Sequence, residues 1–240
     1  MPRRGRLTLP GVPLHLIQQG NNRQAIFFEE ADYRHFFELL HGGARRTDAQ
    51  VHAFVLMTNH FHLLVTTATP DGAGKLMKLV GQSYVQFVNR KYGRTGSLWE
   101  ARFRSCLVQE ESNLHACQRY IELNPVRAQM VLHPAAYPWS SYRANALGEV
   151  DELIEPHMVY EGLGLSLKER CTAYQELFSA DLDPELVSRI RCATNGNFAL
   201  GNEAFAKEIS ATLGRRADRG KPGPPRKPTE PGNQPKPPIG

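Results

Sequence analysis

The sequence of 240 residues lacks long apolar runs and paired cysteines. Residues 1–17 are basic but contain no apolar stretch of signal-peptide length, and no run elsewhere has the length needed to cross a membrane. The four cysteines, Cys106, Cys117, Cys171 and Cys192, are far apart and form no CxxC pair, so neither a zinc knuckle nor a disulfide framework is indicated. These absences predict a globular protein of the cytoplasm with no membrane partner.

Most of the chain also lacks an excess of charge of either sign. Seven of the 29 Lys and Arg residues and two of the 24 acidic residues lie from Gly214 onward, so the remainder carries 22 of each sign. The net charge of +5 therefore lies in the tail, which also holds eight of the 17 prolines and is predicted to be disordered over 214–240. A basic tail favours a polyanion such as nucleic acid, although a tail that only aids solubility has the same composition.

Hydrophobic periodicity predicts alternating strands and helices up to about residue 123. Apolar alternation indicates strands at 12–20, 51–58, 60–67 and 102–109, and helical spacing of apolar residues indicates helices at 29–46, 72–93 and 111–123. Gly42 and Gly43 are expected to end the first helix, and Ser112 or Asn113 to cap the third. The element order predicts an α+β fold with a ferredoxin-like (RRM-like) antiparallel sheet and helices on one face.

The composition changes after residue 147, and the pattern that follows is helical. Helices are predicted at 166–180, 183–196 and 201–216. We therefore divide the chain into a domain at 1–147, a small helical region at 148–213 and the tail at 214–240. The last two helices are compatible with a helix-turn-helix that reads DNA, although helical hairpins that only pack together are commoner.

Two histidines on a predicted strand raise the possibility of a metal site. His60 and His62 point to the same face of the strand, and Phe61 points to the other. A third donor is available at Asn124, which shares a helical face with Tyr120 four residues earlier. By pattern alone the histidines are equally compatible with a structural role, Tyr120 with a helix–sheet boundary and Asn124 with a helix end.

Three segments, in this order, resemble one family. The segments "VLMTNHFHLLV" (55–65), "RYIELNPVRAQMV" (119–131) and "YPWSSYRA" (137–144) resemble the single-tyrosine HUH transposases, and within them the REP-associated tyrosine transposases. The resemblance runs from about Arg6 to Leu147 and includes "PLHLIQQGNNRQ" (13–24) and "GSLWEARFRS" (96–105). It implies an enzyme of DNA transposition that cleaves and rejoins single-stranded or hairpin DNA, such as REP-like palindromes.

The resemblance also implies roles for individual residues. His60 and His62 match the two histidines of the HUH motif, Asn124 matches the third metal ligand, and Tyr120 matches the nucleophile. The implied product is a 5′-phosphotyrosine bond with a free 3′-hydroxyl. Imidazole and amide donors suit Mn²⁺ or Mg²⁺ as the divalent metal, and no small-molecule cofactor is expected.

Tyr84 and Tyr92 are rival nucleophiles, because each follows the histidine strand on a helix. Tyr84 falls on an apolar stripe, and neither tyrosine has an amide side chain four residues later. Tyr120 is therefore preferred.

Basic side chains interleaved with aromatic ones predict contacts to DNA phosphates and bases. The predicted nucleic-acid-binding residues are Arg23, Arg90, Lys91, Arg94, Arg102, Arg104 and Arg127. A DNA-bound protein is expected at the nucleoid in the cytoplasm, as a monomer or a homodimer. Two further hypotheses stay open: a catalytically silent DNA-binding module or repressor, and hydrolysis by metal-activated water, which would make Tyr120 dispensable.

Overall fold

The computed structural model describes residues 5–220, except the side chain of Glu111. The first six elements are β1 (Leu14–Gln19), α1 (Glu30–Thr47), β2 (Ala49–Met57), β3 (His60–Thr67), α2 (Gly72–Lys91) and β4 (Arg104–Val108). They are followed by α3 (Glu110–Glu122), α4 (Asn124–Arg127), α5 (Tyr142–Leu147), α6 (Met158–Glu161), α7 (Leu167–Glu176), α8 (Pro184–Gly196), β5 (Ala199–Leu200) and α9 (Glu203–Leu213). Most of the tail predicted to be disordered, residues 221–240, lies outside the described residues.

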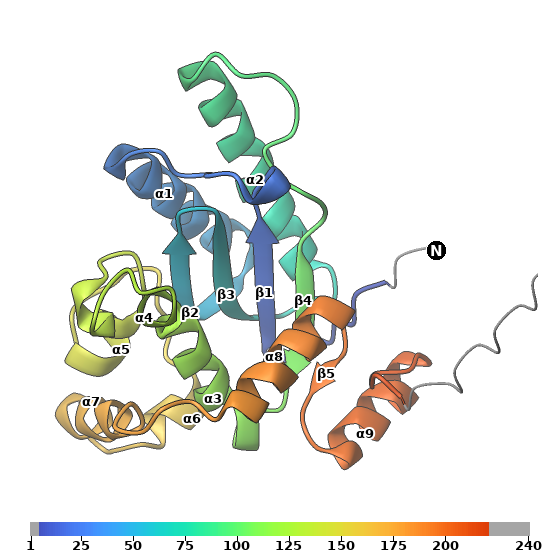
Figure 1. Cartoon of the computed structure of the whole chain (residues 1–240). Helices are drawn as coiled ribbons and strands as arrows, with labels where there is room; N and C mark the ends of the chain where they lie inside the picture. The colour runs from blue at the N-terminus through green and yellow to red at the C-terminus, as the bar shows by residue number, and fades with distance from the viewer. Residues whose placement is uncertain (1–4, 221–240) are drawn as a thin grey trace, which may run out of the picture.

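The five strands form one sheet in the order β2-β3-β1-β4-β5 (Figure 1). The pairs β2–β3, β3–β1 and β1–β4 are antiparallel, which is the ferredoxin-like arrangement. The short β5 then adds a parallel pairing to β4. The predicted α+β fold with a ferredoxin-like sheet is confirmed.

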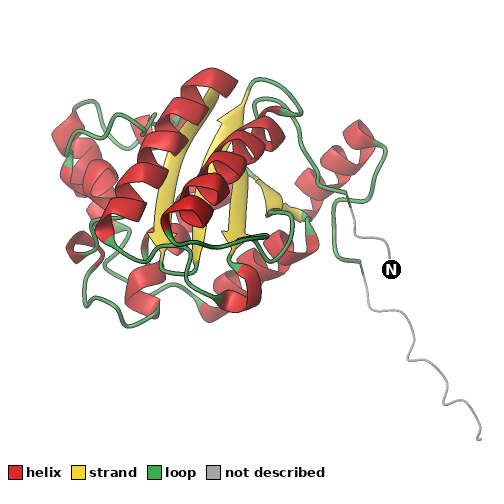
Figure 2. Cartoon of the chain, turned by 90° about the horizontal axis from the view of Figure 1, so that it is seen from above, coloured by secondary structure: helices red, strands yellow, loops and turns green. Residues whose placement is uncertain are grey.

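Helices cover both faces of the sheet, as the view from above shows (Figure 2). On one face α1 and α2 pack over a core that contains Phe61, Leu63 and Val65 of β3. On the other face α3 and α8 pack against the sheet, and the core there contains Leu64 of β3. The second layer differs from the prediction of helices on one face only, because α8 comes from the region predicted to be separate.

The glycine pair in α1 does not end the helix, which continues to Thr47 and ends where Asp48 adopts a positive φ of 51°. At Gly43 a Cβ atom would lie 2.9 Å from Val80 Cγ2, so the missing side chain lets α2 approach α1 closely. The predicted caps of α3 are also wrong, since α3 begins at Glu110 and the N-cap position is Gln109. At Gly43 tertiary packing outweighed the local signal.

The region after residue 147 is not separate from the sheet. α8 packs on β4, β5 extends the sheet edge, and α9 buries Ile209 in the core on the α1–α2 side. α5, α6 and α7 surround a small cluster of their own that contains Tyr142, Tyr160 and Tyr174. Reading of DNA by α8 and α9 as a helix-turn-helix stays a prediction. Within the described residues, no helix combines the length and apolar character needed to span a membrane.

Candidate active site

A cavity of about 430 Å³ lies on the face of the sheet that α3 and α8 cover. Polar and basic side chains dominate its lining, which consists of His15, Ile17, Gln19, Arg23, Asn59, His60, His62, Arg104, Tyr120, Asn124, Arg127, Arg191, Thr194 and Asn195. Among the described residues, four arginines and no carboxylate line this space. Such a lining favours an anion, because the positive charges have no acidic neighbour in the cavity.

The structure brings together the four residues that the sequence placed in one site. His60 and His62 lie on the same face of β3, and α3 crosses that face so that Tyr120 and Asn124 line the same cavity. The ring centroid of Tyr120 lies 5.8 Å from that of His62, and the two rings meet edge to face. The phenol and the imidazole pair therefore share one space, and their chemical roles stay predictions.

The hydrogen bonds of His60 fix which of its ring nitrogens carries a proton. The Asn59 amide nitrogen donates to the Arg23 carbonyl at 3.0 Å, so the Asn59 Oδ1 accepts from His60 Nδ1 at 2.6 Å. Burial, and then the nearby Arg127 charge, lower the pKa of His60 to about 4. The ring is therefore neutral near pH 7, and its Nε2 keeps a lone pair for a metal ion.

His62 is oriented by a longer relay that ends on α8. The Thr194 hydroxyl donates to the Ile190 carbonyl at 2.8 Å, so its oxygen accepts from His15 Nδ1 at 2.9 Å. Burial lowers the pKa of His15 to about 3, and the neutral ring then accepts at Nε2 from His62 Nδ1 at 2.8 Å. Burial also holds the pKa of His62 well below its usual value. The relay thus leaves the Nε2 lone pair of His62 free, as a metal ligand requires.

Asn124 presents its oxygen rather than its nitrogen to the cavity. Its amide nitrogen donates to the carbonyls of Tyr120 and Ile121 at 3.0 and 3.2 Å, which leaves Oδ1 as the accessible polar atom. Arg127 donates to this oxygen at 3.1 Å, and its guanidinium lies 4.3 Å from the centroid of the Tyr120 ring. Pro125 does not remove Arg127 from the site, because α4 restarts helical geometry with Pro125 in its first turn.

The end of α3 is anchored by a buried carboxyl group. Glu122 is fully buried, and it accepts hydrogen bonds from Ser141 at 2.6 Å, from Asn145 at 2.8 Å and from the Tyr174 hydroxyl at 2.9 Å. Burial raises the pKa of Glu122 to about 7, against the opposing effect of these hydrogen bonds. The "YPWSSYRA" segment therefore holds the helix that carries Tyr120 without lining the cavity itself.

Seven of the 14 residues that line the cavity were not predicted from the sequence, and His15 and three polar residues of α8 are among them. His15 lies on β1 beside β3, and Arg191, Thr194 and Asn195 come from α8. The spacing of the last three residues places them on one face of a helix, next to an apolar stripe with Ile190 and Ala193. That polar stripe was a usable signal, but the sequence does not show against which strands α8 packs.

The predicted DNA-binding residues divide into three groups. Arg23, Arg104 and Arg127 line the cavity, and Arg102 lines a different one. Lys91 forms ion pairs with Asp32 at 2.5 Å and Glu29 at 2.6 Å, and the Arg94 guanidinium lies 5.8 Å from the centroid of the Phe28 ring. The three remaining residues, Arg90, Lys91 and Arg94, do not line the cavity. Arg90 and Lys91 lie in the last turn of α2, and Arg94 follows the helix.

The hydroxyl groups of the two rival tyrosines form hydrogen bonds on the opposite side of the sheet. The Tyr84 hydroxyl is buried and donates to the Ile26 carbonyl at 2.7 Å, and the Tyr92 hydroxyl donates to the Asp32 carboxylate at 2.8 Å. Neither residue lines the cavity that holds the histidines.

Comparisons with protein families and with solved structures each found a match. A family model described as "Transposase IS200 like" matches residues 9–124. A solved structure of a REP-associated tyrosine transposase bound to a REP hairpin has 16% sequence identity and a TM-score of 0.53, and the match covers 65% of this chain and 93% of that one. At this identity the likeness shows the fold.

A second solved structure, a candidate transposase from Deinococcus radiodurans R1, has 22% identity and a TM-score of 0.36. The match covers 50% of this chain and 96% of that one. Among curated proteins, none matches the chain at a significant level.

Proposed function

We propose that the chain is an IS200-like transposase, whose family model matches residues 9–124, and that it cleaves and rejoins single-stranded or hairpin DNA through a covalent bond to Tyr120. The observation that carries the proposal is the convergence of Tyr120, His60, His62 and Asn124 in a cavity with four arginines and no acidic lining residue among those described. This arrangement combines a nucleophile, neutral metal donors and an environment for phosphate. The likeness to the fold of a REP-associated transposase makes REP-like palindromes the proposed substrate class.

The donor atoms fit a divalent cation of the Mg²⁺ or Mn²⁺ type. His60 and His62 each keep Nε2 unprotonated, and Asn124 offers Oδ1, so three neutral donors face the cavity. Among the described residues no three His, Cys, Asp or Glu side chains are grouped to hold a metal, and the proposed site takes the amide oxygen of Asn124 as its third protein ligand. When bound, such an ion polarises the scissile phosphate and stabilises negative charge on its non-bridging oxygens.

Tyr120 supplies the attacking oxygen. Its phenol oxygen forms a bond to phosphorus while the bond from phosphorus to the 3′-oxygen breaks, which gives a 5′-phosphotyrosine and a 3′-hydroxyl end. The phenol proton is lost in the attack, and no carboxylate lines the cavity among the described residues. Arg127, whose guanidinium lies 4.3 Å from the centroid of the Tyr120 ring, offsets the negative charge that develops on the phosphate during the attack.

The arginines bind the strand and compensate its charge during transfer. Arg23, Arg104 and Arg191 line the cavity from three different parts of the fold. These are the connection between β1 and α1, strand β4 and helix α8. Attack of a 3′-hydroxyl on the phosphotyrosine reverses the chemistry and rejoins DNA without ATP, because the covalent bond conserves the energy of the phosphodiester. An exposed single strand or a hairpin end is required, since a paired backbone cannot reach a phenol that is 5% exposed.

The experiment is to incubate the protein with labelled hairpin DNA and Mn²⁺ and to search for a covalent adduct on a denaturing gel. The adduct is expected for the wild type and for Tyr92→Phe, which loses a hydroxyl outside the cavity, and is expected to disappear in Tyr120→Phe. Cleavage that survives Tyr120→Phe would favour metal-activated water, and binding without any cleavage would favour a silent DNA-binding module.

A further inference from the structure

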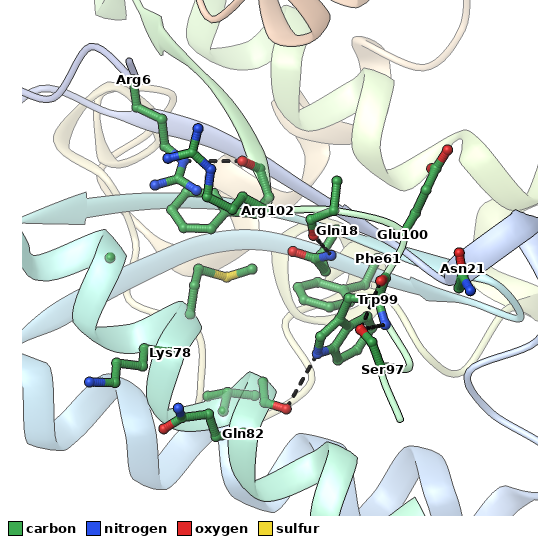
Figure 3. A pocket seen from close by; sticks show the side chains of 16 residues that line it. Arg6, Gln18, Asn21, Phe61, Lys78, Gln82, Ser97, Trp99, Glu100 and Arg102 are labelled. Carbon is green, nitrogen blue, oxygen red and sulfur yellow. Dashed lines mark hydrogen bonds between the residues drawn. The ribbon is translucent and has the colours of Figure 1, made fainter. Parts of the chain in front are cut away.

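A second cavity of about 720 Å³ lies on the opposite face of the sheet, between α2 and residues 97–103 (Figure 3). We call it the Trp99 pocket and define it by its aromatic residues Phe61, Trp99 and Phe103 and its basic residues Arg6, Lys78 and Arg102. Of the three basic residues only Arg102 was among the predicted DNA-binding residues, and none of the six residues lines the cavity of Tyr120.

One wall of the Trp99 pocket is aromatic and is held rigidly. The Trp99 indole nitrogen donates to the Gly81 carbonyl at 3.3 Å, and its ring meets that of Phe61 at 6.0 Å between centroids. Trp99 nevertheless remains partly exposed to the pocket, whereas Phe61 is buried. A flat, fixed and accessible aromatic surface of this kind suits stacking of a planar heterocycle such as a nucleobase.

The other end of the pocket holds two arginines side by side (Figure 3). The Arg6 guanidinium lies 3.5 Å from the centroid of the Phe103 ring and donates to the Phe103 carbonyl at 3.1 Å. Burial, and then the charge of Arg102, lower the pKa of Arg6. Among the described residues no carboxylate forms an ion pair with Arg6, Lys78 or Arg102, and Figure 3 shows the Glu100 carboxylate directed away from the arginine pair. An anion such as phosphate would relieve this repulsion.

A small cavity of about 10 Å³ adjoins both the Trp99 pocket and the cavity of Tyr120. It is lined by Ile17, Gln19 and Arg104, which also line the Tyr120 cavity, and by Gln18, Glu100, Ala101 and Arg102, which also line the Trp99 pocket. Arg104, the first residue of β4, therefore lines the Tyr120 cavity, and Arg102, two residues earlier, lines the Trp99 pocket.

We propose that the Trp99 pocket binds one unpaired nucleotide of the DNA substrate, with its base on Trp99 and its phosphate between Arg6 and Arg102. The proposal rests on the proposed function for the identity of the substrate. The pocket contains none of the groups that cut DNA, so it contributes affinity and fixes the position of the single strand. It is therefore a second point of attachment, on the far side of the sheet from the nucleophile.

Tryptophan fluorescence tests the proposal directly. The chain has two tryptophans, so Trp139→Phe leaves Trp99 as the single reporter. This protein is titrated with a hairpin that carries single-stranded extensions of randomised sequence on both ends, and with the same hairpin without extensions. Saturable quenching of Trp99 is expected with the extended hairpin only, and equal quenching or none with both would overturn the proposal.

Three variants separate the pocket from the rest of the DNA contact. Trp99→Ala is expected to weaken binding of the extended hairpin by about tenfold, the usual effect of losing one stacked base. Gly74→Met fills the arginine end, where a Cβ atom would meet nothing within 4 Å, and it raises helix propensity, so it is expected to weaken binding without loss of fold. Arg102→Gln is expected to weaken binding more than Arg46→Gln, which removes an equal charge from an exposed position on α1.

Adduct formation by Tyr120 is measured in the same proteins, which keeps the two ideas apart. If Trp99→Ala and Gly74→Met form the adduct and bind the extended hairpin with unchanged affinity, the pocket proposal is overturned and the proposed function stays intact. Quenching that is lost in Gly74→Met, but without any adduct in the wild type, would support the pocket and overturn the strand-transfer function.

Discussion

The two faces of β3 show how one strand serves two different environments. Phe61 and Leu63 point into the core under α1 and α2, whereas His60 and His62 point into the cavity under α3 and α8. Phe61 and His62 are equally buried, at 2% exposure each. Burial alone therefore does not distinguish the structural face from the functional face.

The difference lies in how buried polar atoms are satisfied. The face with Phe61 is stabilised by apolar contact, which has no direction and needs no partner groups. The face with His62 requires a relay through His15 and Thr194 to the backbone of α8, because an unpaired buried ring nitrogen is costly. Function on this face therefore depends on an element about 130 residues away in the chain, as the sequence numbers show.

The first test compares the two faces of β3 by replacing one residue from each face with alanine. Phe61→Ala is expected to lower the free energy of unfolding by about 3–5 kcal/mol, since it removes a ring from the apolar core. His60→Ala is expected to abolish cleavage, with little change in stability and with DNA binding nearly intact. Denaturant unfolding, adduct yield and binding of hairpin DNA measure the three effects. Lost DNA binding in His60→Ala would mean that the residue is structural, and the contrast between the faces would fail.

A second prediction concerns the anchor of α3 and the pH dependence of stability. The pKa of Glu122 is about 7 in the folded protein and close to 4.5 when unfolded, so the folded state holds the proton more tightly. The stabilising effect is complete below pH 4.5 and is lost as pH rises through 7, by on the order of 3 kcal/mol. Glu122→Gln is expected to remove this loss.

The measurement is the difference in unfolding free energy between Glu122→Gln and the wild type at pH 5 and at pH 8. The difference is expected to shift in favour of the variant at the higher pH. A difference that does not change with pH would show that Glu122 is not held protonated by burial.

The smallest predicted effect on the fold concerns the end of the relay. Thr194→Val removes the oxygen that accepts from His15 and is expected to lower stability by about 1–2 kcal/mol. The affinity for Mn²⁺ is expected to fall about 10- to 100-fold, as for other losses in the surroundings of a metal ligand. Calorimetric titration with Mn²⁺ measures the affinity without any DNA.

Thr194→Ser is the matched control, because it keeps the hydroxyl and removes only a methyl group. Nitrogen NMR of the apo protein reports the protonated ring nitrogen of His62, which is expected to be Nδ1 in the wild type and in Thr194→Ser. Unchanged metal affinity and an unchanged tautomer in Thr194→Val would remove the relay from the account of the site.

Local pattern predicted much of the fold and the core of the site. The strand at 60–67 was predicted at its observed bounds, because alternation of apolar residues and a flanking polar turn are strong local signals. The pairing of His60 with His62 and of Tyr120 with Asn124 followed from the periods of strand and helix. Local pattern failed at Gly43, where contact with α2 allows the helix to continue.

Contacts between elements distant in the chain could not be predicted in this way. Lys91 pairs with Asp32, which is fully buried and lies 59 positions away, and its contact with DNA stays a prediction. Arg191 was assigned to a separate helical region, although it lines the cavity of Tyr120. Both cases have the same cause. The packing of the helices and strands decides which groups each charged side chain contacts, and the sequence does not show that packing.

The sequence by itself determined which residues share a face of each strand and helix, because these periods are properties of the local backbone. It thereby determined that His60 and His62 share one face of a strand, and that Tyr120 and Asn124 share one face of a helix. Only the tertiary structure decided that these two pairs meet beneath α8, and that His15 and Thr194 set the protonation of His62. The direction of a hydrogen bond depends on its partner, and here the partners come from elements distant in the chain.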